Sequence, residues 1–394
     1  MPTYPQIILK PGREKSLLNR HPWVFSGALE HEPGGIAPGA VVDVTDASGR
    51  FLGRGTYNPA SQIRVRVFTF RDEALDADWF RQRLREAEGW RRDLLPPDTN
   101  AFRVLFGEAD HVPGLIVDRY DRGLVVTFAT AGADYLREII LEALIDACRP
   151  DWIMERSTGG YRKEEGLPPR VEAMYGDVPD EPVRIRENGH AFLVDVRAGQ
   201  KTGFFLDQRE SREALGQMAR GRTVLNAFGY SGAFSVYALA GGARRAVTVD
   251  LSEDAMSLAR QNHEINGQAV EPADLVIADI FNFLREDKTD FDLIVLDPPA
   301  FAKSKAALVR ATRGYKDINW LAMRRLPPGG LLFTFSCSGH VTADLHRKIL
   351  FAAALDAHRE VQILRILGHG LDHPLNVYHP EGEYLTGFIC RVGE

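Results

Sequence analysis

Two short segments contain residue types that can do chemistry, and each stands at the end of a predicted apolar strand. Residues 297–301 read Asp-Pro-Pro-Ala-Phe after LIVL, and residues 336–338 read Ser-Cys-Ser after LLFTF. Because proline lacks an N–H and has a fixed φ, Pro298 and Pro299 end the strand and set the shape of the loop. We expect the carboxylate of Asp297 and the thiol of Cys337 to lie on the same edge of one sheet.

Two reactions fit these groups, and both transfer a methyl group to a nucleic-acid base. An Asp-Pro-Pro-aromatic segment is typical of enzymes that methylate an exocyclic base amine, a reaction that needs no nucleophilic cysteine. Carbon 5 of a pyrimidine is too poor a nucleophile unaided, whereas a thiolate added at carbon 6 makes the ring a reactive enamine. Cys337 precedes a helix with Thr342 as its predicted N-cap, and a helix N-terminus favours the thiolate. We therefore expect Cys337 to be the nucleophile and Asp297 to hydrogen-bond a cytosine around N3 and its 4-amino group.

The sequence assigns no catalytic role to the other two cysteines or to the histidine near Cys337. Cys148 lies in a predicted helix and Cys390 in a predicted strand, and we expect both to be small buried hydrophobic residues. His340 either tunes the Cys337 thiol or faces solvent. Three cysteines without a CxxC pair argue against a disulfide framework and a cysteine zinc site, and no metal is expected.

The ends of four successive predicted strands suit S-adenosylmethionine (SAM). The first strand leads into NAFGYSG, where two glycines allow a tight turn and a close approach to a ligand. The second ends at Asp250, 21 residues after Gly229, the spacing of an acidic residue that binds ribose hydroxyls. The third ends at Asp279, suited to the adenine amino group. The Gly-x-Gly-x-x-Gly fingerprint for a pyrophosphate is absent, which favours SAM over a dinucleotide. The residues expected to bind SAM are Asn226, Phe228, Gly229, Gly232, Asp250, Asp279 and Asp297.

Such strand ends require a parallel sheet with helices on both faces. Apolar strands near 222–228, 246–250, 274–279, 291–297 and 331–338 alternate with helices near 231–240, 252–267, 307–326 and 342–359. An Asn188-Gly189 hairpin precedes them, and the strands VQILRIL and EYLTGFICRV end the chain. The predicted fold class is α/β, with a Rossmann-like domain over residues 183–394.

Two further domains are predicted before residue 183. Residues 1–72 contain short β segments separated by Gly/Pro turns, which predicts a small β-barrel with a hairpin tip at Asp46–Gly49. Residues 73–182 mix strands with two amphipathic helices, which predicts a central α+β domain. Within it, residues 157–170 (STGGYRKEEGLPPR) are predicted to be a linker or flexible loop.

The first domain could bind nucleic acid, although its composition alone does not decide this. Residues 1–72 contain nine Lys/Arg and six Asp/Glu, a net charge of +3, whereas the whole chain has a net charge of −6. Its basic residues either contact phosphates or form an ordinary solvated surface. The candidates are Arg13, Arg20, Arg54 and Arg64. Its aromatic residues Trp23, Phe25 and Tyr57 are more typical of a core than of a base-stacking platform.

The bulk composition is that of an ordinary globular protein. Of 394 residues, 44% are hydrophobic and 26% are charged. No stretch approaches the roughly 18 apolar residues of a membrane helix, and the N-terminus lacks the apolar segment and cleavage site of a signal peptide. We expect a cytoplasmic protein with no membrane segment.

These motifs together resemble one family that covers nearly the whole chain. The chain is similar to the bacterial 23S rRNA 5-methylcytosine methyltransferases, which combine an N-terminal PUA domain, a central α/β domain and a C-terminal Rossmann-like domain. The shared segments are KPGR (10–13), NRHPWVF (19–25), RAGQKTGFFLDQR (197–209), NAFGYSGAF (226–234), LDPPAFAKSK (296–305) and FSCSG (335–339).

The resemblance implies further residues and a partner. It places TGFFLDQR beside the SAM and substrate cleft, so Gln208 and Arg209 become candidates there, whereas the sequence alone allows a solvated helix start. Asn226 stands where related enzymes often have an acidic residue. Another 5-methylcytosine group has a second cysteine beside the Asp-Pro-Pro position, and this chain does not, so the base that removes the carbon-5 proton is unassigned. The implied partner is 23S rRNA with an unpaired or flipped cytosine; monomer and homodimer are both open.

Three other functions remain open at this point. An N-methyltransferase would use residues 297–301 to hold a base amine. A non-catalytic RNA-binding assembly factor would keep the fold without binding SAM. A small-molecule methyltransferase would leave the N-terminal domain without a role.

Overall fold

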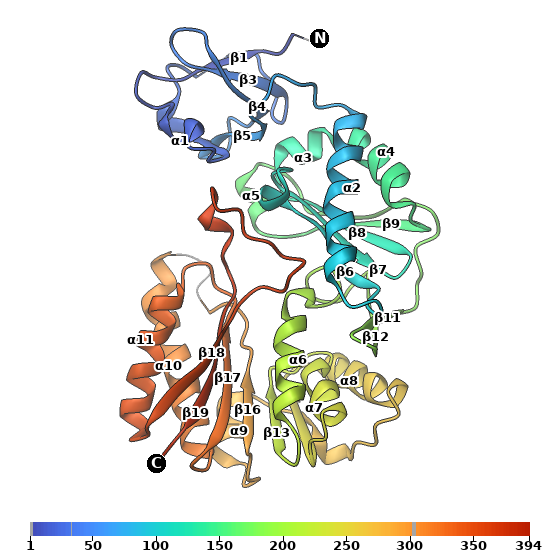
Figure 1. Cartoon of the computed structure of the whole chain (residues 1–394), viewed down its shortest axis with the longest axis vertical. Coiled ribbons are helices and arrows are strands. Elements are labelled where there is room, and N and C mark those ends of the chain that lie inside the picture. The colour runs from blue at the N-terminus through green and yellow to red at the C-terminus, as the bar shows by residue number, and fades with distance from the viewer. Residues whose placement is uncertain (1–2, 33, 302–304) are drawn as a thin grey trace. The chain divides into compact units, whose positions relative to one another are not determined.

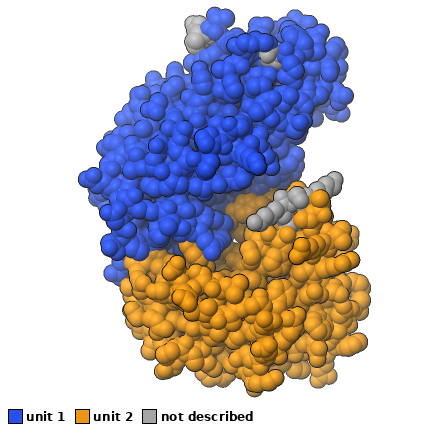
Figure 2. All heavy atoms as spheres, turned by 180° about the vertical axis from the view of Figure 1, so that it is seen from behind, with its two compact units in different colours: residues 1–188, 194–206, 371–382 blue, residues 189–193, 207–370, 383–394 orange. Residues whose placement is uncertain are grey.

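The chain forms two compact units, coloured separately in Figure 2. The computed structural model describes residues 3–32, 34–301 and 305–394. Unit 1 consists of residues 1–188, 194–206 and 371–382, and unit 2 of residues 189–193, 207–370 and 383–394. Residues 194–206 and 371–382, which the sequence assigns to the C-terminal domain, therefore belong to unit 1. The division into three domains at residues 72 and 182 stays a prediction.

The first part of unit 1 is the predicted small β structure. Its strands pair in the order β1-β3-β4-β5-β2, with β1 parallel to β3. Its core consists of aliphatic residues such as Ile7, Val42 and Val65. The Asp46–Gly49 tip is confirmed, because the Asp46 carboxylate accepts the Ser48 N–H at 2.9 Å between paired β3 and β4. The elements are β1 (Gln6–Ile8), α1 (Lys15–Leu18), β2 (Trp23–Phe25), η1 (Ser26–Ala28), β3 (Val41–Thr45), β4 (Phe51–Tyr57) and β5 (Ile63–Thr69).

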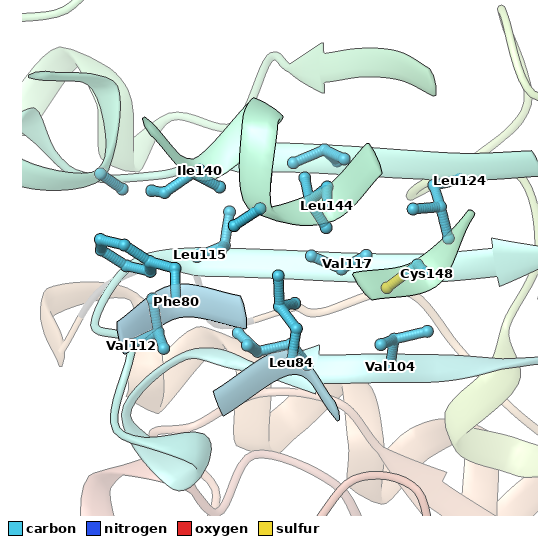
Figure 3. Packing of buried hydrophobic residues seen from close by; sticks show 14 of the residues in the cluster. Phe80, Leu84, Val104, Val112, Leu115, Val117, Leu124, Ile140, Leu144 and Cys148 are labelled. Atoms are coloured by element: carbon cyan, nitrogen blue, oxygen red, sulfur yellow. The ribbon is translucent and has the colours of Figure 1, made fainter. Parts of the chain in front are cut away.

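The second part of unit 1 is a sheet with helices packed on it, as predicted for the central region. The strand order is β10-β9-β8-β7-β6, and β8 and β9 are parallel. Apolar side chains of α2 and α4 pack on this sheet: Figure 3 shows Phe80 and Leu84 together with Ile140 and Leu144. The elements are α2 (Ala77–Leu94), β6 (Ala101–Phe106), η2 (Gly107–Asp110), β7 (Leu115–Tyr120), β8 (Gly123–Phe128), α3 (Ala131–Tyr135), α4 (Arg137–Cys148), β9 (Trp152–Ser157), α5 (Tyr161–Glu164) and β10 (Arg170–Tyr175).

The two parts of unit 1 pack tightly against each other. Gly132 of α3 lies against Thr56 of β4, and a Cβ at position 132 would stand 1.9 Å from the Thr56 hydroxyl oxygen. Only glycine allows this approach, so the β structure and the central sheet share a close interface.

The predicted linker at residues 157–170 is wrong in part. It contains the helical turn α5, and Arg162 in this turn is almost fully buried. The Arg162 guanidinium donates to the carbonyl oxygens of Phe128 and Pro168 and to the Asp134 carboxylate. The glycines and prolines of this segment therefore shape an anchored turn, and the sequence pattern does not reveal the buried arginine that holds it.

Unit 2 contains the predicted sheet with helices on both faces (Figure 1). The strand order is β15-β14-β13-β16-β17-β19-β18; β13 to β17 are parallel, whereas β19 is antiparallel to both neighbours. The predicted hairpin β11–β12 is also present. From residue 183 onward the elements, of which β11 and η6 belong to unit 1, are β11 (Val183–Glu187), β12 (His190–Val194), η3 (Leu206–Gln208), α6 (Arg209–Met218), β13 (Thr223–Ala227), α7 (Ala233–Ala240), β14 (Arg245–Asp250), α8 (Glu253–Ile265), η4 (Pro272–Asp274), β15 (Leu275–Ile277), α9 (Ile280–Glu286), β16 (Leu293–Leu296), η5 (Lys305–Ala307), α10 (Leu308–Arg325), β17 (Gly330–Ser336), α11 (Ala343–Ala357), β18 (Val361–Leu367), η6 (Pro380–Gly382) and β19 (Thr386–Val392).

The central strands β13, β16 and β17 are buried on both faces, which explains their continuous apolar sequences, whereas most residues of the edge strand β18 are exposed. Alternate residues of β16 enter two different cores: Ile294 and Leu296 pack with α9, α10 and α11, whereas Leu293 and Val295 pack with α6 and α7. Among the described helices, none has the length and apolar character needed to span a membrane.

Unit 1 contains a buried ion pair that we expect to be essential for its stability. Asp118 is fully buried, accepts two hydrogen bonds from Arg103 at 2.8 and 2.9 Å, and accepts the Thr202 hydroxyl at 2.6 Å. Asp118→Asn leaves the buried Arg103 charge without its carboxylate, and breaking such pairs costs about 3–5 kcal/mol. Guanidinium denaturation should show this loss in the transition of unit 1. The matched variant Asp121→Asn, at an exposed site, should stay within about 0.5 kcal/mol of the parent; equal stabilities would contradict the prediction.

Candidate active site

The candidate site lies where the strand order of unit 2 reverses. β13 stands between β14 and β16, and all three run parallel, so their carboxyl ends meet at one edge. Ligands of such sheets bind at this position. The structure places Asn226 in β13, Asp250 at the end of β14, and Asp279, Asp297 and Cys337 just beyond β15, β16 and β17.

The loop after β13 is held in an uncommon backbone conformation. Phe228, Tyr230 and Gly232 have φ values of 61°, 43° and 70°. Left-handed φ in a residue other than glycine costs roughly 1–2 kcal/mol, and such strain concentrates at functional sites. Gly229 lies so close to β14 that a Cβ there would stand 2.2 Å from Thr248 Cγ2. The loop therefore follows the sheet closely and presents its backbone at the strand ends.

Asn226 has an unused hydrogen-bond acceptor in this site. Its Nδ2 donates to Ser235 Oγ at 3.1 Å, and Ser235 Oγ lies 2.7 Å from Thr248 Oγ1. The Asn226 Oδ1 atom is buried and has no hydrogen-bond partner among the described residues. A buried acceptor without a partner is costly, so the side chain fits a donor from a bound molecule.

Asp250 and Asp279 each accept hydrogen bonds from the backbone and keep acceptor capacity for a ligand. The Asp250 carboxylate accepts the N–H groups of Tyr230 and Ser252 at 3.0 and 3.1 Å. Asp279 is the N-cap of α9 and accepts the Asn282 N–H at 3.0 Å. A carboxylate has about four lone-pair sites, so these contacts orient the side chains without exhausting them. The capping role of Asp279 was not predicted.

Gln208 and Arg209 are not a solvated helix start. Both lie at the junction of η3 and α6 and are almost fully buried, with exposed fractions of 2% and 1%. Arg209 pairs with Glu210 at 3.1 Å, and Gln208 Oε1 has no hydrogen-bond partner among the described residues. The solvated alternative is therefore wrong.

Cys337 differs from the other two cysteines in its exposure. Cys148 and Cys390 are buried, and burial raises the pKa of each thiol to about 12. Cys337 is only partly buried, and its Sγ lies 3.7 Å from the Pro298 carbonyl oxygen. The thiol and the loop that contains Asp297 are thus neighbours, as expected from the adjacent strands.

The predicted surroundings of Cys337 are partly confirmed. Thr342 is the N-cap of α11, and its hydroxyl accepts the Leu345 N–H at 3.2 Å. His340 is exposed, which agrees with the alternative that it faces solvent.

Two buried residues beneath this loop were not predicted from the sequence. Tyr315 of α10 packs against Phe301, with ring centroids 4.7 Å apart and the ring planes at 44° to each other. Burial raises the pKa of the Tyr315 phenol, the nearby Ser336 opposes this shift, and the ionised forms of Cys337 and Asp297 add to it. His346 of α11 lies 6.3 Å from the Tyr315 ring, and its Nδ1 is 3.0 Å from Thr386 Oγ1. The only sequence signal was their position on apolar helix faces, which does not distinguish a site from a core.

The four candidate phosphate-binding arginines have different environments in unit 1. Arg13 and Arg20 are exposed. Arg64 pairs with Glu32 at 3.0 Å. Arg54 has a side chain only 3% exposed and contacts the carboxylates of Asp43 and Asp72. Since its charge is balanced within the protein, Arg54 is poorly suited to bind a phosphate.

The three aromatic residues of the first domain also differ. Tyr57 is buried and donates to Glu32 at 3.0 Å, which confirms a core position. Trp23 is partly buried and donates to Glu108 at 2.9 Å. Phe25 is 50% exposed, so its assignment to the core is wrong.

The sequence is similar to those of known proteins. Residues 7–70 match the model of a PUA-like domain, and residues 137–357 match the model of an S-adenosylmethionine-dependent methyltransferase. The Ribosomal RNA large subunit methyltransferase I of Salmonella arizonae and that of Salmonella typhimurium are each 46% identical over 99% of this chain and 98% of their own.

Solved structures show the same fold. A SAM-dependent methyltransferase from Streptococcus mutans superposes with a TM-score of 0.84 at 22% identity, over 98% of this chain and 100% of its own. A methyltransferase complexed with SAH superposes with a TM-score of 0.85 at 23% identity, with the same coverage.

Gly229→Ala should weaken SAM binding. The new Cβ would overlap the Thr248 methyl group, and overpacking of this kind costs about 1–3 kcal/mol. We expect the Kd for SAM, measured by calorimetry, to rise roughly tenfold. Adding Thr248→Ser removes the clashing methyl and should restore much of the affinity, whereas Gly89→Ala, at a site with open space, should have no effect. Unchanged binding in Gly229→Ala would refute the close approach.

His346 should make unit 2 sensitive to acid. Burial lowers its pKa from 6.5 to about 4, so the folded state resists a proton that the unfolded state accepts. The free energy of unfolding of unit 2 is therefore highest above pH 6.5. It decreases as the pH falls towards 4, by up to about 3 kcal/mol. Denaturation at pH 7 and pH 4.5 should show a smaller difference for His346→Gln than for the parent, and exposed His340→Gln should match the parent. Equal pH dependence in His346→Gln and the parent would contradict this.

Proposed function

The chain belongs to the S-adenosylmethionine-dependent methyltransferases of the Ribosomal RNA large subunit methyltransferase I family, and we propose that it forms 5-methylcytosine in 23S ribosomal RNA. The Salmonella relatives are named for large-subunit ribosomal RNA, and the PUA-like domain supports an RNA substrate. A ribosomal RNA substrate also favours the cytoplasm as its location.

The cofactor is SAM, and the residues at the strand ends suit it. The buried Oδ1 of Asn226 lacks a partner among the described residues, and the carboxylates of Asp250 and Asp279 have acceptor capacity left. We assign Asp250 to the ribose hydroxyls, Asp279 to the adenine amino group, and the backbone of the 228–232 loop to the remainder of the cofactor. Gln208 and Arg209 belong to the same proposed site. Bound SAM supplies an electrophilic methyl carbon.

The single observation that supports cytosine C5 chemistry is the position of Cys337. It is a partly exposed thiol at a strand end, 3.7 Å from the carbonyl oxygen of Pro298, in the loop that begins with Asp297. N-methylation of a base amine needs no nucleophilic thiol, whereas methylation at carbon 5 requires a nucleophile that adds to carbon 6.

The proposed reaction uses the Cys337 thiolate, the cytosine and the methyl group of the cofactor. The Cys337 thiolate forms a bond to cytosine C6, and the displaced electron pair makes C5 nucleophilic. C5 then takes the methyl group, and the bond between that carbon and the SAM sulfur breaks, which leaves S-adenosylhomocysteine. Transfer of the C5 proton to a base returns the electron pair to the C5–C6 bond and expels the thiolate, which regenerates the enzyme.

Asp297 positions the base in this scheme. Its side chain hydrogen-bonds the cytosine around N3 and the 4-amino group and so stabilises the adduct, and Pro298 and Pro299 fix the loop from which it projects. Attack at C6 needs access to the face of the base, so the cytosine must be unpaired or flipped out.

Cys337→Ala should abolish 5-methylcytosine formation. Without the thiolate no adduct forms, and we expect the rate to fall on the order of 10³-fold or more, while the Kd for SAM stays within about twofold. Mass spectrometry of nucleosides from treated ribosomal RNA measures the product. Cys390→Ala removes a buried thiol as the matched control and should keep the activity. Full activity in Cys337→Ala would eliminate this mechanism.

RNA that contains 5-fluorocytidine separates the two candidate reactions. When fluorine replaces hydrogen at C5, there is no C5 proton whose loss could expel the thiolate. The parent enzyme should therefore stay covalently attached to the RNA on a denaturing gel, and Cys337→Ala should not. An N-methylated base without any trapped adduct would instead support the alternative, in which the Asp297–Phe301 segment holds a base amine.

A further inference from the structure

A positively charged cavity in unit 1 lies outside the candidate active site. It is open to solvent and has a volume of about 200 Å³, and its lining includes Arg20, Arg71, Arg83 and His111 together with Phe70. Arg20 and Arg71 come from the N-terminal β structure and the segment just after it, whereas Arg83 lies on α2 and His111 follows η2. The cavity thus exists only where the two parts of unit 1 pack together.

Two of the three arginines that line this cavity have no ion pair. Neither Arg20 nor Arg71, both exposed, has an ion-pair partner among the described residues, and Arg83 has a single contact, to exposed Glu86 at 3.3 Å. Two carboxylates outside the lining interact with it, Glu73 with the two arginines after residue 70 and Asp110 with the histidine. The lining itself contains three guanidinium groups and no carboxylate.

Titratable neighbours respond to this charge. Burial lowers the pKa of His111, the positive charge of Arg83 lowers it further, Asp110 opposes the shift, and Arg20 adds to it. Burial disfavours ionised Glu73, but hydrogen bonds from Thr69 and Trp79 and then the charges of Arg83 and Arg71 lower its pKa overall. Both groups thus experience a positive electrostatic potential.

Helix ends place two residues of this cavity. Arg20 and His111 have φ values of 65° and 61°. Arg20 follows the C-cap of α1 and His111 is the C-cap of η2, positions at which a left-handed residue commonly ends a helix. The Arg20 guanidinium lies over the Phe70 ring, 5.3 Å from its centroid.

We propose that this cavity binds a phosphate group of the RNA substrate. Its size suits a phosphate, and guanidinium groups match phosphate oxygens in charge and hydrogen-bond geometry. This inference rests on the proposed action on ribosomal RNA. It assigns Arg71, Arg83 and His111, which the sequence did not indicate, to one anchor together with Arg20. A phosphate held at the junction would fix the RNA backbone against both parts of unit 1 at once.

Charge removal from the cavity tests the proposal. Arg20→Gln, Arg71→Gln and Arg83→Gln should each weaken binding of a labelled large-subunit ribosomal RNA fragment by roughly 3–10-fold in fluorescence anisotropy. The plot of log affinity against log salt concentration should lose about one unit of slope in each variant. Arg85→Gln, an exposed charge on the same helix α2 outside the cavity, should change neither quantity.

The outcomes separate this inference from the cytosine chemistry. Trapping on 5-fluorocytidine RNA at saturating RNA should remain intact in Arg71→Gln, because Cys337 is untouched. Unchanged RNA affinity and slope in the three variants, or an equal loss in Arg85→Gln, would overturn the phosphate site while leaving the Cys337 mechanism standing. Phosphorus NMR with inorganic phosphate measures whether the cavity binds free phosphate, and so distinguishes a free-phosphate site from a site for the RNA backbone. Variants that lose phosphate binding but keep full RNA affinity would overturn the RNA assignment.

Discussion

The parallel pairing of β16 with β17 is the constraint on which the proposed reaction centre depends. The register runs from Leu293 opposite Leu331 to Leu296 opposite Thr334, and it brings the two loops that follow to one edge of the sheet. A slip of one residue would turn every side chain of a strand to the other face, and both faces of β16 are packed. The cores on the two faces therefore enforce the register that places Asp297 near Cys337.

The cofactor loop depends on the same rigid sheet. Phe228 and Tyr230 occupy left-handed backbone conformations, which persist only when their surroundings determine them. Here the surroundings are the Thr248 side chain under Gly229 and the Asp250 carboxylate that accepts the Tyr230 N–H. Thus β14 both supports the loop and supplies an acidic ligand, so the strained loop and its Asp are fixed together.

Local patterns predicted the elements of unit 2 well, because apolar strands and capped helices are encoded within short windows. The strand-end positions of Asp250 and Asp297 followed directly from that alternation. What the sequence could not supply was the partner of a residue distant in the chain. The burial of Arg54 between two carboxylates, the anchoring of Arg162, and the place of Tyr315 beside Phe301 all depend on tertiary packing. A charged residue in a polar stretch of sequence is expected to be solvated, because the sequence does not show which distant residues bury it.

The RAGQKTGFFLDQR segment contributes residues to both units. Thr202 lies in unit 1, where its hydroxyl donates to the buried Asp118. Only a few residues later, Gln208 and Arg209 begin the first helix of unit 2 and are buried there. A short run of chain therefore supplies buried side chains to two separate cores, which a local sequence pattern does not reveal.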